Sequence, residues 1–272
     1  MIFRSYIPAA PLSDFVALFW LYEGYVQPHA RERVLPDGSV ELVVSLVEVE
    51  SRVYDGEPTS GRTFRNGVMA GARSEFLVID TASQASVMGV HFKPGGAYPF
   101  LPMPTSELHN AVVALDDLWG ATAASLREHL LEATTTDAKF HILEQTLLEQ
   151  ARRPLARHRA VAYALDELQR ERHARSISDV TDETGLSARR FIQVFSEEVG
   201  LTPKLFCRVR RFQQVLSLIH TAAQINWADV AVRCGYFDQA HFIHDFQAFS
   251  GINPTTYLAH KTPHLNHVPL ND

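Results

Sequence analysis

The sequence predicts an α+β protein in which a β-rich N-terminal domain precedes an all-α C-terminal domain. Two observations carry this prediction. The first hundred residues hold short segments rich in β-branched and aromatic residues, separated by turn residues. From Leu155 onward the apolar residues recur at helical spacing, and this region contains an internal repeat. A length of 272 residues accommodates two domains, each with its own core.

The N-terminal half is expected to form a small β-barrel or sandwich followed by helices, since such a fold closes most sheet edges. The turn signals are Pro36-Asp37-Gly38, Asp55-Gly56, Asn66-Gly67 and Lys93-Pro94-Gly95-Gly96. The expected strands are Val16–Tyr25, Val40–Val49, Val68–Ala72, Phe76–Asp80 and Ser86–Phe92. The expected helices are Tyr98–Leu101, Ala121–Glu132 and Asp137–Arg152.

Arg152-Arg153-Pro154 interrupts the last of these helices and marks a domain boundary. We expect domains at 1–152 and 155–261, followed by a flexible tail at 262–272. The C-terminal domain is expected to contain helices over His158–Arg170, Ile177–Thr184, Ser187–Glu198, Pro203–His220, Trp227–Arg233, Asp238–Phe249 and Pro254–Ala259.

Composition indicates an ordinary globular protein, with 46% hydrophobic and 21% charged residues. No apolar run approaches the length of a membrane span, and no signal peptide is visible, so we expect a cytoplasmic protein without membrane contact. The two cysteines, Cys207 and Cys234, lie in helical patterns and indicate a reducing compartment. Residues 1–154 carry 12 Lys and Arg against 19 Asp and Glu, whereas residues 155–272 carry 13 against 12. The acidic charge therefore resides in the first domain.

An internal repeat is the strongest feature of the sequence. The first copy runs from Val180 through Gly185, Ser187, Phe191 and Phe195 to Gly200 and Pro203. The second runs, 50 to 51 residues later, from Val230 through Gly235, Asp238, Phe242 and Phe246 to Gly251 and Pro254. The first glycine of each copy ends a short helix, the Ser or Asp caps the next helix, and the aromatic pair at i and i+4 faces the core. This order predicts two helix-turn-helix units, although two helical units that only pack together would show a related pattern.

The segment between the two copies reads as one long amphipathic helix. Its apolar stripe includes Val209, Phe212 and Ile219. A helix of ~16 residues spans roughly 24 Å. Such a spacer can hold two recognition helices near one turn of DNA apart, about 34 Å. One chain is therefore expected to read two successive major grooves.

Residues 155–260 resemble the DNA-binding domain of the AraC/XylS family of transcription regulators. The resemblance rests on Gly-Leu-Ser-Ala-Arg-Arg-Phe at 185–191, Val-Gly-Leu-Thr-Pro-Lys at 199–204, Arg-Val-Arg-Arg-Phe at 208–212 and Val-Arg-Cys-Gly-Tyr-Phe-Asp-Gln-Ala-His-Phe at 232–242. It implies a sequence-specific activator or repressor that binds double-stranded DNA, with RNA polymerase as a further partner. The DNA-binding residues that it implies are Ser187, Arg189, Arg190, Ile192 and Gln193 in the first unit, Gln239, Ala240, His241 and His244 in the second, and Lys204 and Arg208 on the spacer helix.

Arginine can bind guanine and glutamine can bind adenine through paired hydrogen bonds, which makes the exposed residues of the recognition helices candidates for base contacts. Lys204, Arg208, Arg210 and Arg211 are candidates for phosphate contacts, or else form a solvated face.

The second recognition helix departs from the family pattern. It lacks Arg and Lys, since His244 stands where the family usually has Arg, and Asp245 follows it. The first helix of the first unit is acidic, with Asp179, Asp182 and Glu183. We therefore expect the first unit to dominate affinity, and the second to bind weakly, or better below about pH 6.5, where an ordinary histidine is protonated.

The N-terminal half resembles an uncharacterised domain that often precedes AraC-type units. The resemblance rests on Val-Leu-Pro-Asp-Gly-Ser-Val-Glu-Leu-Val at 34–43, Gly-Val-His-Phe-Lys-Pro-Gly-Gly-Ala at 89–97 and Leu-Asp-Asp-Leu-Trp-Gly at 115–120. It implies a cupin-like barrel that senses a small molecule, forms a homodimer, or both.

Few residues of this first domain indicate chemistry. Asp37 is either a pocket carboxylate or a turn residue, and Trp20, Tyr22 and Phe92 either line a pocket or pack in the core. The histidines His29, His91 and His109 are too widely spaced to indicate a metal site, so we expect no metal and no cofactor.

The expected function is therefore a non-enzymatic transcription regulator, dimeric through residues 1–150 and modulated by an unknown small molecule. Two alternatives remain open. The barrel could be an enzyme that the helical domain localises, or the helical units could have lost DNA affinity and serve as a protein-interaction module.

Overall fold

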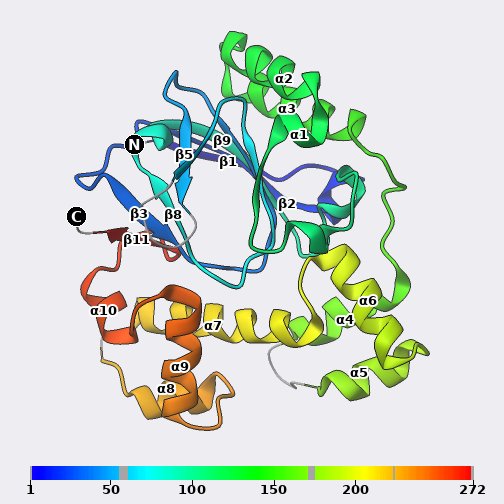
Figure 1. Cartoon of the computed structure of the whole chain (residues 1–272), viewed down its shortest axis with the longest axis vertical. Helices are drawn as coiled ribbons and strands as arrows, with labels where there is room; N and C mark the ends of the chain where they lie inside the picture. Colours follow the sequence, from blue (N-terminus) through cyan, green and yellow to red (C-terminus); the bar gives the residue numbers. More distant parts are fainter. Residues whose placement is uncertain (1, 55–60, 171–174, 223, 271–272) are drawn as a thin grey trace.

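The computed structural model describes residues 2–54, 61–170, 175–222 and 224–270. A β-rich N-terminal domain with three helices at its far end is joined to a helical C-terminal domain, as Figure 1 shows. The α+β class and its division into a β-rich part and a helical part are confirmed. The expected Asp55-Gly56 turn lies outside the described residues.

The strands form two antiparallel sheets and not a closed barrel, so of the two expected forms, barrel and sandwich, the barrel is wrong. The six-stranded sheet has the order β1 (Ile2–Tyr6), β2 (Val16–Glu23), β9 (Ser86–Phe92), β4 (Glu41–Ser45), β7 (Val68–Ala70) and β10 (Val112–Ala114). The five-stranded sheet has the order β11 (His267–Leu270), β3 (Arg31–Val34), β8 (Leu77–Asp80), β5 (Ser51–Tyr54) and β6 (Gly61–Phe64).

Short helices follow and connect these strands. They are the 3₁₀ helices η1 (Leu12–Asp14), η2 (Ala82–Gln84), η3 (Tyr98–Phe100) and η4 (Thr105–Leu108), and the α-helices α1 (Leu115–Trp119), α2 (Ala121–Glu132) and α3 (Thr136–Glu149). The expected helix at 98–101 is a short 3₁₀ turn over Tyr98–Phe100. Apolar side chains such as Leu126, Leu130 and Leu143 bury one face of α2 and α3.

The C-terminal domain contains all seven helices that the hydrophobic spacing predicts. They are α4 (Arg159–Gln169), α5 (Ile177–Thr184), α6 (Ala188–Val199), α7 (Pro203–Thr221), α8 (Trp227–Arg233), α9 (Gln239–Ser250) and α10 (Pro254–Ala259). In Figure 1, α7 runs beneath the sheets and separates them from α8, while α5 and α8 lie at the far edge of the molecule. At 1.5 Å per residue, the 19 residues of α7 span roughly 28 Å, slightly more than expected.

The predicted flexible tail at 262–272 is wrong for residues 267–270. These residues form β11, which pairs antiparallel with β3 in the register His267–Val34 to Leu270–Arg31. Val268 is 1% exposed and packs in the main core. The chain therefore returns from the helical domain to the sheets, where β11 covers an edge that β3 would otherwise expose.

One continuous core runs through both domains. A Cβ placed on Gly38 in the sheet domain would lie 3.4 Å from Val209 and 3.6 Å from Leu201, so this turn packs against the helical domain. Gln213 on α7 donates a hydrogen bond to the carbonyl oxygen of Pro36 over 2.7 Å. Arg157 donates to the carbonyl oxygen of Pro94 over 2.6 Å. These contacts hold the helical domain against the sheets.

Candidate DNA-binding surface and ligand cavity

The first helix-turn-helix unit consists of α5, a turn at Gly185 and α6. Gly185 has a φ of 72°, as the sharp turn requires. Ser187 caps α6 by accepting a hydrogen bond from the backbone N–H of Arg190 over 3.3 Å. Phe191 and Phe195 are both fully buried. The predicted turn, cap and aromatic pair of the first unit are confirmed.

The outer face of α6 carries the residues that we expected to meet DNA. Arg189, Arg190, Ile192 and Gln193 are exposed, as is Ser187 at the cap. Ile192, which follows the buried Phe191, is 45% exposed. Gln193 donates a hydrogen bond to Glu197 over 2.8 Å. The face therefore offers two guanidinium groups, one amide and one apolar side chain.

The second unit consists of α8, a turn at Gly235 and α9, and repeats this geometry. Asp238 caps α9 by accepting from the backbone N–H of His241 over 2.7 Å. Phe242 and Phe246 are fully buried. The exposed residues on α9 include all four predicted positions, which are Gln239, Ala240, His241 and His244.

Phe237 is a surface residue that the sequence interpretation missed. Its side chain is 91% exposed in the turn before α9, and Val232 on α8 is 70% exposed. The shift of the repeat offset from 50 to 51 residues falls in this turn, because the second copy has one residue more between its glycine and its cap than the first. An exposed phenylalanine at a helix-turn-helix turn can make apolar contacts with a thymine methyl group or a sugar.

The arginines of α7 are engaged within the protein rather than turned outward. Arg208 forms an ion pair with Asp245 of α9 over 2.6 Å, and its guanidinium lies over the ring of Phe249. Arg210 donates to the carbonyl oxygen of Gln169, and Arg211 donates to that of Gly235. Lys204, by contrast, is exposed at the start of α7. A phosphate contact by Arg208 would have to compete with its ion pair.

The same ion pair changes the charge that α9 presents. Asp245 is 2% exposed and lies beneath the surface, paired with Arg208. Its carboxylate therefore does not add an exposed negative charge beside His244. On the first unit, Glu183 is bound by Arg175 and Tyr163, so part of the acidic charge of α5 is also compensated.

A cavity of about 400 Å³ lies in the N-terminal domain. Trp20 and Tyr22 line it from β2 in the six-stranded sheet, and Leu77 and Ile79 line it from β8 in the five-stranded sheet. Its lining also includes three residues that follow α10 in the chain: His264, Asn266 and His267. The cavity is therefore bounded by residues of both sheets and by the segment that returns from the helical domain.

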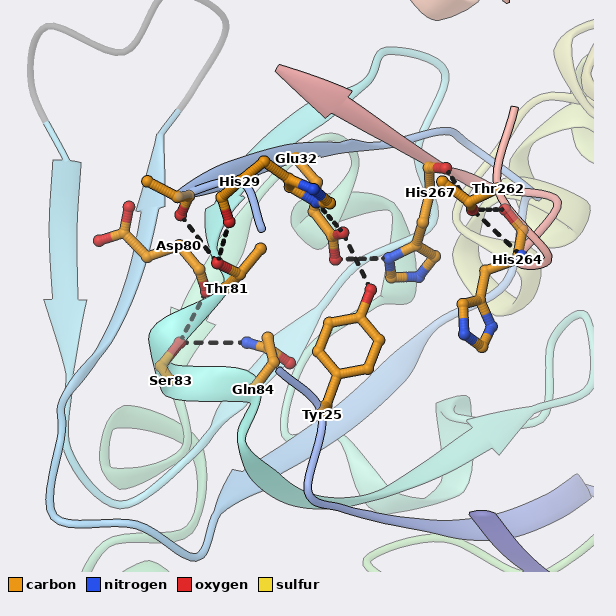
Figure 2. A network of polar contacts seen from close by, with 11 residues as sticks. Tyr25, His29, Glu32, Asp80, Thr81, Ser83, Gln84, Thr262, His264 and His267 are labelled. Atoms are coloured by element: carbon orange, nitrogen blue, oxygen red, sulfur yellow. Dashed lines mark hydrogen bonds and ion pairs between the residues drawn. The ribbon is translucent and has the colours of Figure 1, made fainter. Parts of the chain in front are cut away.

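Glu32 is the buried charge at one wall of this cavity. It is 1% exposed and accepts hydrogen bonds from Tyr25 over 3.0 Å, His29 over 3.2 Å and His267 over 2.7 Å (Figure 2). Burial alone would raise the pKa of Glu32, but the hydrogen bonds from His267, His29 and Tyr25 hold it below its ordinary value. Glu32 thus ties the C-terminal segment to the sheet domain through an ionised carboxylate.

A second polar cluster lies on the cavity wall around His91. Its Nδ1 lies 2.8 Å from Glu41, and its Nε2 lies 3.9 Å from Asp37. Burial by itself would lower the pKa of His91, but the hydrogen bond to Glu41 and the charges of Glu41 and Asp37 raise it to about 9. Asp37 serves in both of the roles left open by the sequence, because it lines the cavity and also accepts from the backbone N–H of Ser39 in the turn.

The other candidate residues of the N-terminal domain lie in different surroundings. Trp20 and Tyr22 line the cavity, whereas Phe92 is fully buried in the core. His29 and His91 belong to the two separate clusters just described, and His109 contacts Ser74. In the part of the chain that the structure describes, no three His, Cys, Asp or Glu side chains gather in a way that could hold a metal ion. No helix in the described ranges is long and apolar enough to span a membrane.

Two family models match the chain. Residues 180–260 match a helix-turn-helix domain, which confirms that predicted element. Residues 4–114 match a domain of unknown function, DUF6597. The cavity lining drawn from β2, β4, β7 and β8 lies within this second match.

Comparison with individual proteins gives more distant similarities. An uncharacterised HTH-type transcriptional regulator of Haemophilus influenzae is 26% identical over 121 residues, which cover 43% of this chain and 39% of the relative. The match thus spans about two fifths of that relative's length. Crystal structures of ToxT from Vibrio cholerae are also similar. One has a TM-score of 0.48 at 9% identity and covers 95% of this chain and 98% of ToxT, and another has a TM-score of 0.47 at 13% identity with coverages of 89% and 97%.

Proposed function

We propose that this chain, whose C-terminal third is a helix-turn-helix domain of the AraC/XylS type, is a sequence-specific DNA-binding transcription regulator. The observation that carries the proposal is the paired geometry of α6 and α9. Each is preceded by a capped turn, and each buries an aromatic pair. Each also exposes polar side chains on its outer face, which are Arg189, Arg190 and Gln193 on α6 and Gln239, His241 and His244 on α9. The rigid helix α7 connects the two units. This is the arrangement by which one chain can enter two successive major grooves.

In this proposal the first unit supplies most of the binding energy. Arg189, Arg190 and Gln193 are exposed on α6, where they can contact bases and phosphates. The corresponding surface of α9 has Gln239, His241 and His244, which bind DNA without a fixed positive charge. We add Phe237 to the contacts of the second unit, because its exposed ring stands immediately before α9.

We further propose that the cavity binds a small-molecule effector. Its volume of about 400 Å³ falls in the range of small-molecule sites, which run from about 300 to 1,000 Å³. The lining combines aromatic and aliphatic walls with a few convergent polar groups, as ligand sites usually do. The proposal also includes a homodimer formed through residues 1–150, contact with RNA polymerase, a cytoplasmic location and the absence of catalysis. Ile2, Ile7 and Leu131 are exposed apolar residues available for dimer contacts.

The proposal is tested by selecting duplexes from a random DNA pool with the full chain and then measuring binding by fluorescence anisotropy over a range of salt concentrations. We expect selected duplexes to bind about 10³-fold more tightly than scrambled ones. The double variant Arg189→Ala/Arg190→Ala should bind about 100-fold more weakly and show a smaller salt dependence. Arg65→Ala serves as the matched control, because Arg65 is an exposed arginine of the N-terminal domain. A pool that never enriches, or equal weak binding to all DNA, would contradict the proposal and favour a protein-interaction module.

A further inference from the structure

The C-terminal ends of both recognition helices meet one short segment of the N-terminal domain. This segment, residues 71–76, connects β7 to β8, and we call it the connector. At the end of α6, a Cβ placed on Gly200 would lie 3.0 Å from the Cβ of Ala72. At the end of α9, a Cβ placed on Gly251 would lie 2.4 Å from the ring of Phe76. Ala72 and Phe76 are four residues apart, so one connector contacts both helices.

These two contacts are closely packed and leave no room for a side chain at either glycine. Gly251 has a φ of 70°, and the Phe76 ring occupies the space that any side chain at position 251 would need. Ala72 is fully buried, and Thr105 of η4 packs against Gly200 as well, since its Cγ2 would also lie 3.0 Å from a Cβ placed on that glycine. A displacement of the connector therefore has to move the helix ends or break the contacts.

The connector also forms part of the cavity wall. Gly71 and Arg73 line the cavity, as do Ala70 and Leu77 on either side of the connector. Successive residues thus alternate in their roles, with Gly71 and Arg73 facing the cavity and Ala72 and Phe76 packing on the recognition helices. A molecule in the cavity would therefore touch Gly71 and Arg73, which are neighbours of the residues in the same connector that pack against α6 and α9.

Residues 108–111 brace the connector so that it can move as a unit. Arg73 donates to the carbonyl oxygen of Asn110 over 2.9 Å, and the side chain of Asn110 accepts from the backbone N–H of Ser74 over 2.7 Å. The backbone N–H of Asn110 donates in turn to the carbonyl oxygen of Ala72. A braced segment transmits a displacement, whereas a loose loop would absorb it.

We propose that the connector sets the distance between the two recognition helices, and thereby the half-site spacing that the protein accepts, and that occupancy of the cavity changes this distance through Gly71 and Arg73. The inference rests on the proposed function, since a half-site spacing has meaning only for a DNA-binding protein. It assigns Ala72 and Phe76 as positioning residues that do not touch DNA.

The test measures the distance between α6 and α9 in the full chain without DNA. Spin labels are attached at Ala188→Cys and Ala240→Cys in a background carrying Cys207→Ser and Cys234→Ala, and the distance distribution is recorded by double electron–electron resonance. Ala188 and Ala240 are exposed, so the labels do not disturb the core. Phe76→Ala should broaden the distance distribution about twofold, because the end of α9 at Gly251 loses the ring that it packs against. Ala70→Leu, which fills part of the cavity beside Gly71, should shift the mean distance by about 1–2 Å.

Two controls accompany these variants. Phe140→Ala removes a ring of the same size from α3, at the end of the N-terminal domain away from the connector, and should leave the distribution unchanged. Circular dichroism checks that each variant is folded, and Phe76→Val replaces Phe76→Ala if the latter does not fold. The proposal is overturned if either folded variant, at position 76 or at position 70, gives the parental distribution. Because no DNA is present, this result stands apart from the DNA-binding test of the proposed function.

Discussion

Arg208 and Lys204 have different environments although they lie one turn apart on the same helix. Both carry positive charge and both are candidates for phosphate contacts by sequence, but only the structure shows that Arg208 pairs with the buried Asp245. A sequence pattern gives the face of a helix and does not reveal which charge on that face has a buried partner. The same limit applies to Glu32, because one of its three hydrogen-bond donors is His267, which lies 235 residues away in the chain.

Arg208→Ala should therefore lower the free energy of unfolding by about 2 kcal/mol, because it removes the nearest charge partner of the buried Asp245 carboxylate and leaves only His241, at 3.9 Å. This estimate is below the usual cost for a fully buried pair, since Arg208 is 30% exposed. Lys204→Ala should leave stability unchanged and weaken DNA binding by a similar amount on all sequences. Urea denaturation and anisotropy separate the two effects. Equal stability of both variants would contradict the assignment, and Arg208→Ala/Asp245→Ala should recover part of the loss.

His91 should titrate with a pKa of about 9 in the folded protein. Because this value lies above the ordinary value of about 6.5, the pairing of His91 stabilises the fold fully below about pH 6.5 and is lost as the pH rises through about 9. Glu41→Gln should bring the pKa of His91 down, since Glu41 supplies both the hydrogen bond and the nearest charge. Proton NMR of the imidazole ring measures this directly, with Glu107→Gln as an exposed control. A wild-type value near 6.5 would refute the paired arrangement.

Among the secondary-structure elements, the helices of the C-terminal domain were predictable because each has a complete local signature. α6, for example, has a serine cap, an apolar face and a terminal glycine, all within its own stretch of sequence. The strands with a regular apolar pattern, such as β2 and β9, were predictable for the same reason. β3 was not, because its sequence Arg-Glu-Arg-Val reads as a charged loop. Its glutamate is buried only through contacts from elsewhere in the chain.

β11 is the element whose structure differs most from what we expected from its sequence. We expected residues 262–272 to form a flexible tail, yet residues 267–270 pair with β3 and supply His267 to Glu32. Whether such a segment is ordered depends on an available sheet edge, which no local pattern encodes.

Val268→Asp tests this strand. Val268 is 1% exposed, so burying a carboxylate there should cost about 3 kcal/mol and release β11 from β3. Amide hydrogen exchange in residues 31–34 and 267–270 should then become about 100-fold faster. Val26→Asp is the matched control, because Val26 is 83% exposed. Unchanged exchange in Val268→Asp would show that β11 does not depend on this packing.

At the scale of the whole molecule, the repeat predicted two DNA-reading units and the chain length accommodated two domains, but neither predicted how the domains contact each other. The contacts of Ala72 with Gly200 and of Phe76 with Gly251 join residues more than a hundred positions apart. The cavity, likewise, is lined by residues from near both ends of the chain, from Phe3 to His267. Contacts between residues so far apart in the chain depend on the completed fold, whereas caps, turns and apolar faces depend on local sequence.

The most direct test compares the affinity of the full chain for two duplexes. One is a selected duplex, and the other is the same duplex with about five base pairs, or half a helical turn, inserted between its two half-sites. If α6 and α9 of one chain occupy successive grooves, the insertion turns one half-site to the far side of the duplex, where the second helix cannot reach it. The affinity should then fall about 100-fold, to that of a duplex with the first half-site alone. Equal affinity for the two duplexes would contradict the claim that one chain reads DNA with both recognition helices.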